Sequence, residues 1–94
     1  MPYALRQQAT GELLAMQQIN AYQLAYFGVV LWQERPDEAE CRRALQRAGV
    51  TDPEAWAPCE LTEHEAKLAN VKLRNDPSRR VCLRGGVLEA EKRS

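Results

Sequence analysis

The alternation of apolar and polar side chains over residues 3–8 predicts a β-strand close to the start of the chain. A short turn over residues 9–11 follows, in which Gly11 can adopt a positive φ, and residues 12–16 then resume the strand pattern. We therefore expect an N-terminal β-hairpin. The competing interpretation is a helix over residues 12–27, because strong helix formers occupy this stretch and its apolar residues would line one helical face.

Aromatic and β-branched residues concentrate between Tyr22 and Trp32, and this composition favours strands over a helix. We expect a third strand over residues 29–33, with Gly28 marking a bulge or a bend just before it. Phe27 and Trp32 lie in the densest apolar run, so we expect them in the core. This apolar run, residues 24–32, is about half as long as a membrane-spanning helix, and we expect no association with a membrane.

Two helices are predicted from the residues at their ends. The first begins at Pro36, because proline is favoured in the first helical turn, and it ends at Gly49. Acidic residues near its start and arginines near its end complement the helix dipole. Its apolar face consists mostly of small side chains, so the helix should lie close to a sheet; the face is formed by Cys41, Ala44, Leu45 and Ala48.

The second helix is predicted to begin after Thr62 and to run to about Arg74. The side chains of Thr62 and Glu65 have the spacing of a capping box, in which each side chain accepts a hydrogen bond from the other residue's backbone. Residues 56–61, just before this helix, predict a short strand. Pro58 restricts that strand to an edge or an irregular position.

Residues 80–84 and 87–90 predict a C-terminal hairpin, because a Gly-Gly turn separates two strand-like segments. Together, these elements predict an α+β fold in a single domain over residues 1–94. The expected sheet is mixed or antiparallel. It is built from the N-terminal hairpin, a central strand and the C-terminal hairpin, and the two helices cover one of its faces.

The cysteine and histidine content argues against a catalytic or metal site. The three cysteines, Cys41, Cys59 and Cys82, are odd in number and widely spaced, which is typical of reduced thiols in the cytoplasm. Zinc sites usually place two cysteines about two to four residues apart, and no such pair is present. The single histidine, His64, lies between two glutamates in the second helix. We therefore expect a cytoplasmic protein with no signal peptide, no cofactor, no metal and no enzymatic activity.

Charge is distributed unevenly, although the chain has 13 basic and 13 acidic residues. Residues 34–65 carry four basic and nine acidic residues, whereas residues 66–94 carry eight basic and three acidic residues. The basic C-terminal third suggests nucleic-acid binding as an alternative function, through cations able to face phosphates: Lys72, Arg74, Arg79, Arg80 and Arg84. A solvated surface is the other interpretation. No aromatic residue follows Trp56, which argues against binding a single strand by base stacking.

The function favoured by the sequence is that of a small protein-interaction module that is able to self-associate. Tyr22 and Tyr26 lie among neutral polar residues and are candidates for a contact patch. Val81 and Leu83 lie on a strand expected at a sheet edge, where unpaired backbone groups can extend the sheet into a second copy. A net charge of zero removes long-range repulsion between copies. The expected partner is therefore another protein or a second copy of the chain.

Overall fold

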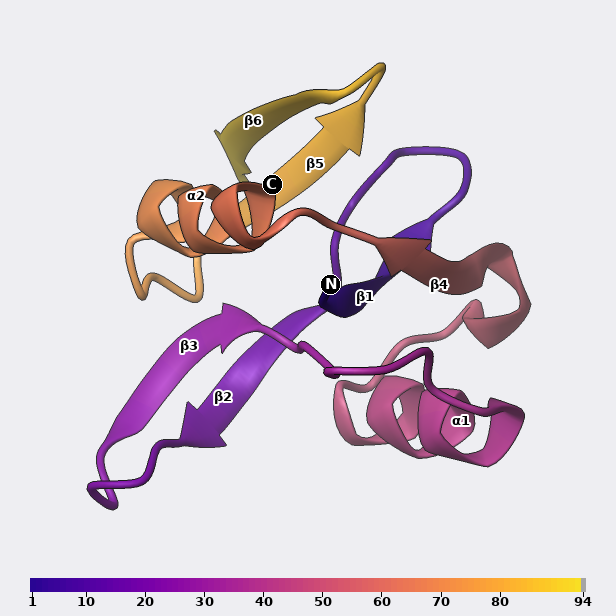
Figure 1. Cartoon of the computed structure of the whole chain (residues 1–94), viewed down its shortest axis with the longest axis horizontal. Coiled ribbons are helices and arrows are strands. Elements are labelled where there is room, and N and C mark those ends of the chain that lie inside the picture. Colours follow the sequence, from indigo (N-terminus) through magenta and orange to yellow (C-terminus); the bar gives the residue numbers. More distant parts are fainter. Residues whose placement is uncertain (94) are drawn as a thin grey trace.

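The computed structural model describes residues 1–93, and within them it contains six strands, two α-helices and one 3-10 turn (Figure 1). In chain order these elements are β1 (Tyr3–Gln7), β2 (Ala15–Ile19), β3 (Ala25–Val29), α1 (Glu38–Arg47), η1 (Pro53–Ala55), β4 (Trp56–Glu60), α2 (Glu63–Leu73), β5 (Arg79–Arg84) and β6 (Val87–Lys92). The strands pair antiparallel, as β1 with β4, β2 with β3, and β5 with β6. The predicted α+β fold class is confirmed.

The segment between β1 and β2 joins the three strand pairs through backbone hydrogen bonds. Leu14 donates its N–H to the carbonyl of Leu5 in β1 at 2.9 Å and accepts from the N–H of Val30, just after β3, also at 2.9 Å. Leu13 donates to the carbonyl of Val81 in β5 at 3.0 Å. The three two-stranded ladders are thereby connected into one continuous network of backbone hydrogen bonds.

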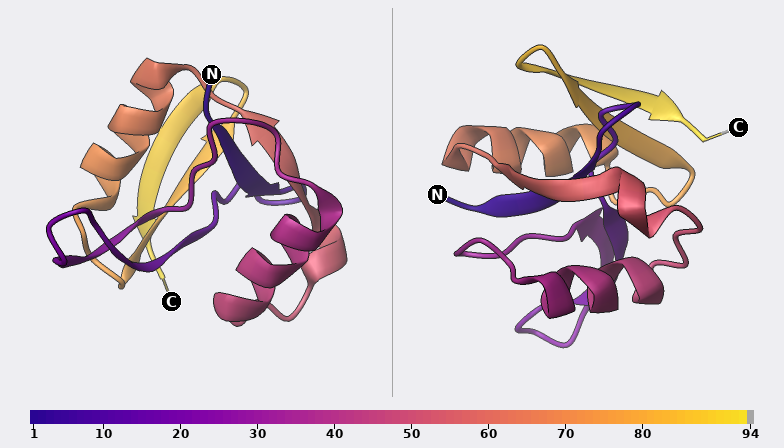
Figure 2. Two further views of the ribbon diagram at one scale, coloured as in Figure 1. Left: turned by 60° about the horizontal axis from the view of Figure 1, so that its bottom comes forward. Right: turned by 90° about the vertical axis from the view of Figure 1, so that its right-hand side faces the viewer.

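The two helices cover different parts of the core. α2 lies against β3, β5 and β6 (Figure 2), whereas α1 lies on the far side of the β1–β4 pair (Figure 1). The larger cluster of buried residues lies beneath α2 and consists of Ala4, Leu13, Phe27, Val29, Leu61, Ala66, Ala69, Leu73, Val81 and Leu88. The smaller cluster lies beneath α1 and consists of Leu5, Leu14, Ala44 and Leu45. The expectation that both helices cover one face of one sheet is therefore wrong.

The N-terminal hairpin is confirmed in part, because the returning segment pairs with β1 through the Arg6–Leu13 bridge, whereas the ladder of β1 is formed with β4. β1 turns back at once, because Gly11 donates its N–H to the carbonyl of Gln7 and Gln7 donates to the carbonyl of Glu12, each at 2.8 Å. Residues 15–19 then continue as β2, so the alternative helix over residues 12–27 is wrong. The β-branched and aromatic residues of this stretch favour strands, and this preference outweighs that of its helix-forming residues.

The third strand lies four residues earlier than expected. β3 starts at Ala25, and of the predicted strand over residues 29–33 only Val29 belongs to it. Trp32 keeps a single bridge to Tyr3, with N···O distances of 2.8 and 2.9 Å. No bulge occurs at Gly28, whose pairing with β2 is in regular register. The glycine instead leaves room for the Tyr26 ring and the Asn70 side chain, whose Cε2 and Oδ1 lie 2.8 and 3.1 Å from the position that a Cβ would occupy.

Both helices begin with a capping box. The predicted box of α2 is confirmed, since the Thr62 hydroxyl accepts from the N–H of Glu65 and the Glu65 carboxylate accepts from the N–H of Thr62, each at 2.9 Å. α1 is capped in the same way by Asp37, which accepts from the N–H of Glu40 at 2.8 Å. Pro36 precedes this cap, so the start predicted for α1 was two residues early. Neither helix is long and apolar enough to cross a membrane.

Replacing Thr62 with alanine is expected to lower the free energy of unfolding by about 0.5 to 2 kcal/mol, because the N-cap hydroxyl satisfies an otherwise unpaired helix N–H. Urea unfolding of wild type and variant measures the loss. Thr51→Ala is the matched control, since Thr51 is exposed and lies outside the helices. Equal unfolding midpoints for Thr62→Ala and wild type would show that the cap does not stabilise the fold.

Candidate functional site

The β2–β3 hairpin, called here the hairpin arm (residues 15–29), extends from the rest of the molecule (Figure 1). Seven consecutive residues at its tip, 19–25, are exposed to solvent. Three of them are large and apolar, namely Ile19, Tyr22 and Leu24, whose exposed fractions are 68%, 83% and 61%. Clusters of exposed apolar side chains are unusual on protein surfaces and are typical of contact sites.

The tip is an ordered turn. Asn20 is its centre, because its side-chain Oδ1 accepts from the N–H groups of Tyr22 at 2.8 Å and Leu24 at 3.1 Å. The backbone N–H of Asn20 donates to the carbonyl of Leu24 at 3.0 Å, and Gln23 adopts a φ of 62° to close the turn. Tyr22 and Leu24 are therefore presented from a hydrogen-bonded frame.

The outer edge of β3 is covered by α2. The N–H of Val29 donates to Oδ1 of Asn70 in α2 at 2.8 Å, and the N–H of Phe27 donates to Oδ1 of Asn75, just after the helix. Two side-chain amides thus take the place of a neighbouring strand. The outward N–H groups of Phe27 and Val29 are satisfied in this way, so β3 offers neither of them to another chain.

The outer edge of β2 has no such cover. Hydrogen-bonded pairs alternate along an antiparallel ladder, and here the residues that pair with β3 have even numbers, as the bonds at Leu14 and Asn20 show at its two ends. The peptide groups of Gln17 and Ile19 consequently point away from β3. No backbone or side-chain partner for them is found in residues 1–93.

A groove separates this edge from α1. It consists of two adjoining hollows of about 560 and 410 Å³, which share Met16, Gln17 and Arg47 as lining residues. All four residues from 16 to 19 line the smaller hollow. Because alternate side chains of a strand point to opposite faces, four consecutive lining residues place part of the groove along the edge of β2. Val30 and Trp32, which follow β3, extend it over the face of the arm that is turned toward α1.

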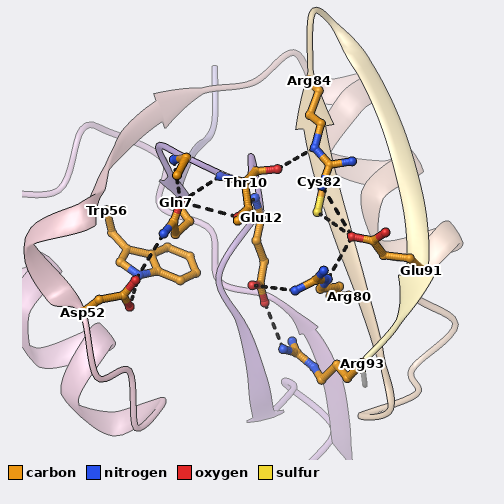
Figure 3. Close-up of polar contacts among 11 residues, drawn as sticks. Gln7, Thr10, Glu12, Asp52, Trp56, Arg80, Cys82, Arg84, Glu91 and Arg93 are labelled. Carbon is orange, nitrogen blue, oxygen red and sulfur yellow. Dashed lines mark hydrogen bonds and ion pairs between the residues drawn. The ribbon is translucent and has the colours of Figure 1, made fainter.

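The acidic residues of the larger hollow are engaged within the chain. Asp52 accepts from Nε1 of Trp56 at 3.0 Å and from Nε2 of Gln7 at 3.1 Å (Figure 3), and these two donors hold the pKa of its carboxyl below the usual value. Glu12 lies between Arg93 at 3.0 Å and Arg80 at 3.9 Å. Neither carboxylate is available to pair with a ligand without breaking these contacts.

Two basic residues of the groove have no partner in residues 1–93. Glu40, which lines the smaller hollow together with them, accepts from the N–H of Asp37 at 3.1 Å as part of the α1 capping box. Arg43 and Arg47 are exposed and make no hydrogen bond or ion pair there. The groove thus presents two guanidinium groups along α1 that make no hydrogen bond or ion pair within residues 1–93.

The candidate interaction residues predicted from the sequence are not brought together. Tyr22 is at the exposed tip, while Tyr26 is half-buried and donates its hydroxyl to Oε1 of Gln18 at 3.1 Å. Val81 is fully buried and Leu83 is half-buried. β5 pairs with β6 on one side and with the segment before β2 on the other, so the expectation of a free edge at this strand is wrong.

The basic residues that were predicted as candidates for nucleic-acid binding fall into two groups. The first group lies at the end of α2. Arg79 donates from Nε and Nη2 to the carbonyl of Lys72, at 3.2 and 3.1 Å, which caps the helix C-terminus. The side chains of Lys72 and Arg74 have no partner in residues 1–93. Arg74 itself is the C-cap, with a φ of 58°.

The second group, Arg80 and Arg84, is bound to the chain on β5 (Figure 3). Arg80 pairs with Glu91 at 2.9 Å, and Arg84 donates to the carbonyl of Thr10 at 2.6 Å. The buried Cys82 thiol lies 3.5 Å from the same Glu91 carboxylate, and this contact together with Arg80 lowers the pKa of Glu91. The predicted basic residues therefore do not form one cluster facing solvent.

The three cysteines lie apart, in α1, β4 and β5, and all three are free thiols. Burial is the main cause that raises the pKa of each thiol above its usual value, so none is activated as a nucleophile. His64 is exposed at the start of α2. Within residues 1–93, no three histidine, cysteine, aspartate or glutamate side chains lie close enough together to hold a metal ion.

The groove and its two free arginines were missed by the sequence reasoning, which assigned the arginines of the first helix only to the helix dipole. A local signal existed, because Arg43 and Arg47 are like charges four residues apart, an arrangement that weakens an isolated helix. No protein-family model, curated protein or solved structure matches the chain.

Proposed function

We propose that the chain is a protein-interaction module that binds its partner through the hairpin arm. The observation that carries the proposal is the exposure of Ile19, Tyr22 and Leu24 at the tip. Burying such side chains on binding removes apolar surface from water at no cost to the core, and tyrosine is favoured at protein interfaces. The turn centred on Asn20 supports the proposal further, because a preorganised contact loses little conformational entropy when it binds.

Two other sequence-based hypotheses receive less support. Self-association through β5 lacks a free edge, since that strand has hydrogen-bonded neighbours on both sides. Nucleic-acid binding would need Arg79, Arg80 and Arg84 to leave the partners that they hold within the chain. A cytoplasmic location remains part of the proposal, and the odd number and wide spacing of the free cysteines favour it.

Selection from a library of random peptides, followed by titration of the selected peptides, tests the proposal. Peptides selected on wild type are expected to bind the Tyr22→Ser/Leu24→Ser variant at least tenfold more weakly, because the variant removes the apolar contact at the tip. Val71→Ser is the matched control: Val71 is 69% exposed but lies on α2, away from the arm. Selected peptides that bind all three proteins equally would contradict the proposal, as would a selection that yields none.

Sedimentation equilibrium at micromolar concentration identifies the kind of partner. With β5 paired on both sides, we expect wild type to sediment as a single chain of 10.7 kDa. A dimer that is lost in the Tyr22→Ser/Leu24→Ser variant would instead identify a second copy as the partner of the arm. A dimer that persists in this variant would place self-association on a different surface.

A further inference from the structure

We propose that the groove between β2 and α1 receives an extended acidic segment of a partner protein, which adds to the free edge of β2 as a strand and places its carboxylates on Arg43 and Arg47. This inference deepens the proposed function, on which it rests, by identifying the partner's chemistry. Three independent features carry it: the unpaired backbone of β2, the shape of the groove, and the charge of its wall on α1.

The backbone of β2 is ready to accept a strand. The peptide groups of Gln17 and Ile19 point away from β3 and have no partner in residues 1–93, whereas the outward N–H groups of Phe27 and Val29 in β3 donate to side-chain amides. Exposed edges are normally protected by charged residues, proline or a bulge. Residues 15–20 contain no charged residue and no proline, and the β2–β3 register is regular. The edge is therefore unprotected as well as unpaired.

The groove lies where an added strand would run. Residues 16–19 line it consecutively, so the space follows the strand edge. Its two hollows, of about 560 and 410 Å³, fall within the range of about 300 to 1,000 Å³ usual for ligand sites. The apolar side chains of Val30, Trp32 and Ala44 also line it and offer contacts for side chains on one face of the added strand.

The spacing of the two free arginines matches a strand. Arg43 and Arg47 are one helical turn apart, which corresponds to about 6 Å along the helix axis. Side chains on one face of a strand repeat every two residues, or about 6.6 Å. Alternate glutamates of an extended segment can thus reach both guanidinium groups. The three acidic side chains that line the groove accept hydrogen bonds inside the chain, whereas these two guanidinium groups have no partner in residues 1–93 and are free to bind a carboxylate.

A second copy of this chain does not satisfy the same requirement. Its own free edge is β2, and residues 13–33 contain no charged side chain. Pairing two β2 edges would leave Arg43 and Arg47 of both copies without carboxylates. The two free arginines therefore favour a foreign acidic segment over self-association.

The probe is a fluorescein-labelled peptide, Glu-Val-Glu-Thr-Glu-Val-Glu, compared with the same peptide carrying lysine in place of each glutamate. Fluorescence anisotropy is expected to show binding of the glutamate peptide to wild type at least tenfold tighter than binding of the lysine peptide. Arg43→Glu and Arg47→Glu are each expected to weaken binding at least tenfold. Arg42→Glu is the control for the charge change on α1, because Arg42 lies on the same helix outside the groove, where it pairs with the exposed Glu38 at 3.2 Å.

Amide hydrogen exchange followed by NMR tests strand addition separately from charge. Saturating peptide is expected to slow exchange of the Gln17 and Ile19 amides at least tenfold. Exchange of the Met16 and Gln18 amides, which already bond to β3, should change little. Binding without protection of Gln17 and Ile19 would overturn strand addition, and equal affinity for the two peptides would overturn the acidic specificity. No detectable binding would overturn the whole inference.

These outcomes are distinguishable from failure of the proposed function. Library-selected peptides that depend on Tyr22 and Leu24, with no binding of the acidic peptide, would overturn only the inference about the groove. Binding of the acidic peptide that protects Gln17, with no effect of changes at the tip, would overturn only the role of the tip.

Discussion

Replacing Gly11 with alanine is expected to lower the free energy of unfolding by about 2 to 5 kcal/mol. Gly11 adopts a φ of 82°, where an L-residue with a side chain costs about 1 to 2 kcal/mol. A Cβ at this position would also lie 2.6 Å from the carbonyl oxygen of Leu83, and relieving such an overlap costs about 1 to 3 kcal/mol. That oxygen accepts from Nε of Arg6 at 2.9 Å, and the N–H of Leu83 donates to the Gly11 carbonyl at 2.8 Å.

Gly49→Ala separates the two contributions at Gly11. Gly49 has a similar φ of 74°, but nothing lies within 4 Å of its prospective Cβ. We expect this control to lose only the backbone contribution of about 1 to 2 kcal/mol. Guanidinium unfolding of both variants measures the difference. Equal losses of unfolding free energy at the two glycines would mean that β5 moves away from the added Cβ at Gly11 without destabilising the fold.

Replacing Leu13 with alanine is expected to destabilise the chain by about 2 to 5 kcal/mol, the usual range for a buried leucine that leaves a cavity. Leu13 has no exposed surface and belongs to the larger cluster, in the segment that joins the ladders. Leu24→Ala is the control, because Leu24 is 61% exposed at the arm tip and should change stability by less than about 0.5 kcal/mol. Thermal unfolding of the two variants measures both effects, and similar losses would show that the core does not depend on Leu13.

The features that the sequence predicted correctly are those encoded by neighbouring residues. The capping box of Thr62 and Glu65 and the Gly-Gly turn of the C-terminal hairpin each need only a few consecutive residues, and both are present. The start of β3 was misplaced because a short turn built on Asn20 creates a hairpin inside what reads as one apolar run. Local signals thus predicted ends and turns better than strand positions.

The parts that were missed depend on residues far apart in the chain. Nothing within β5 indicates that the segment before β2 lies beside it, so Val81 was placed at an edge although it is buried in the core. The groove likewise exists only because α1 and β2 come together in space. Of the candidate surface, the sequence anticipated Tyr22 as a contact residue. Its role remains a prediction, and the free arginines of the groove were not anticipated.

The amides of Asn70 and Asn75 on β3 also limit the stoichiometry of any assembly built on the hairpin arm. Head-to-tail polymerisation requires two open edges, one that receives a strand and one that offers the next. Here the β3 edge is occupied by residues of the same molecule, so no further chain can be added once a strand has paired with β2. The arm can therefore form closed one-to-one complexes, whereas growth of a filament through it would first require the two asparagines to release β3.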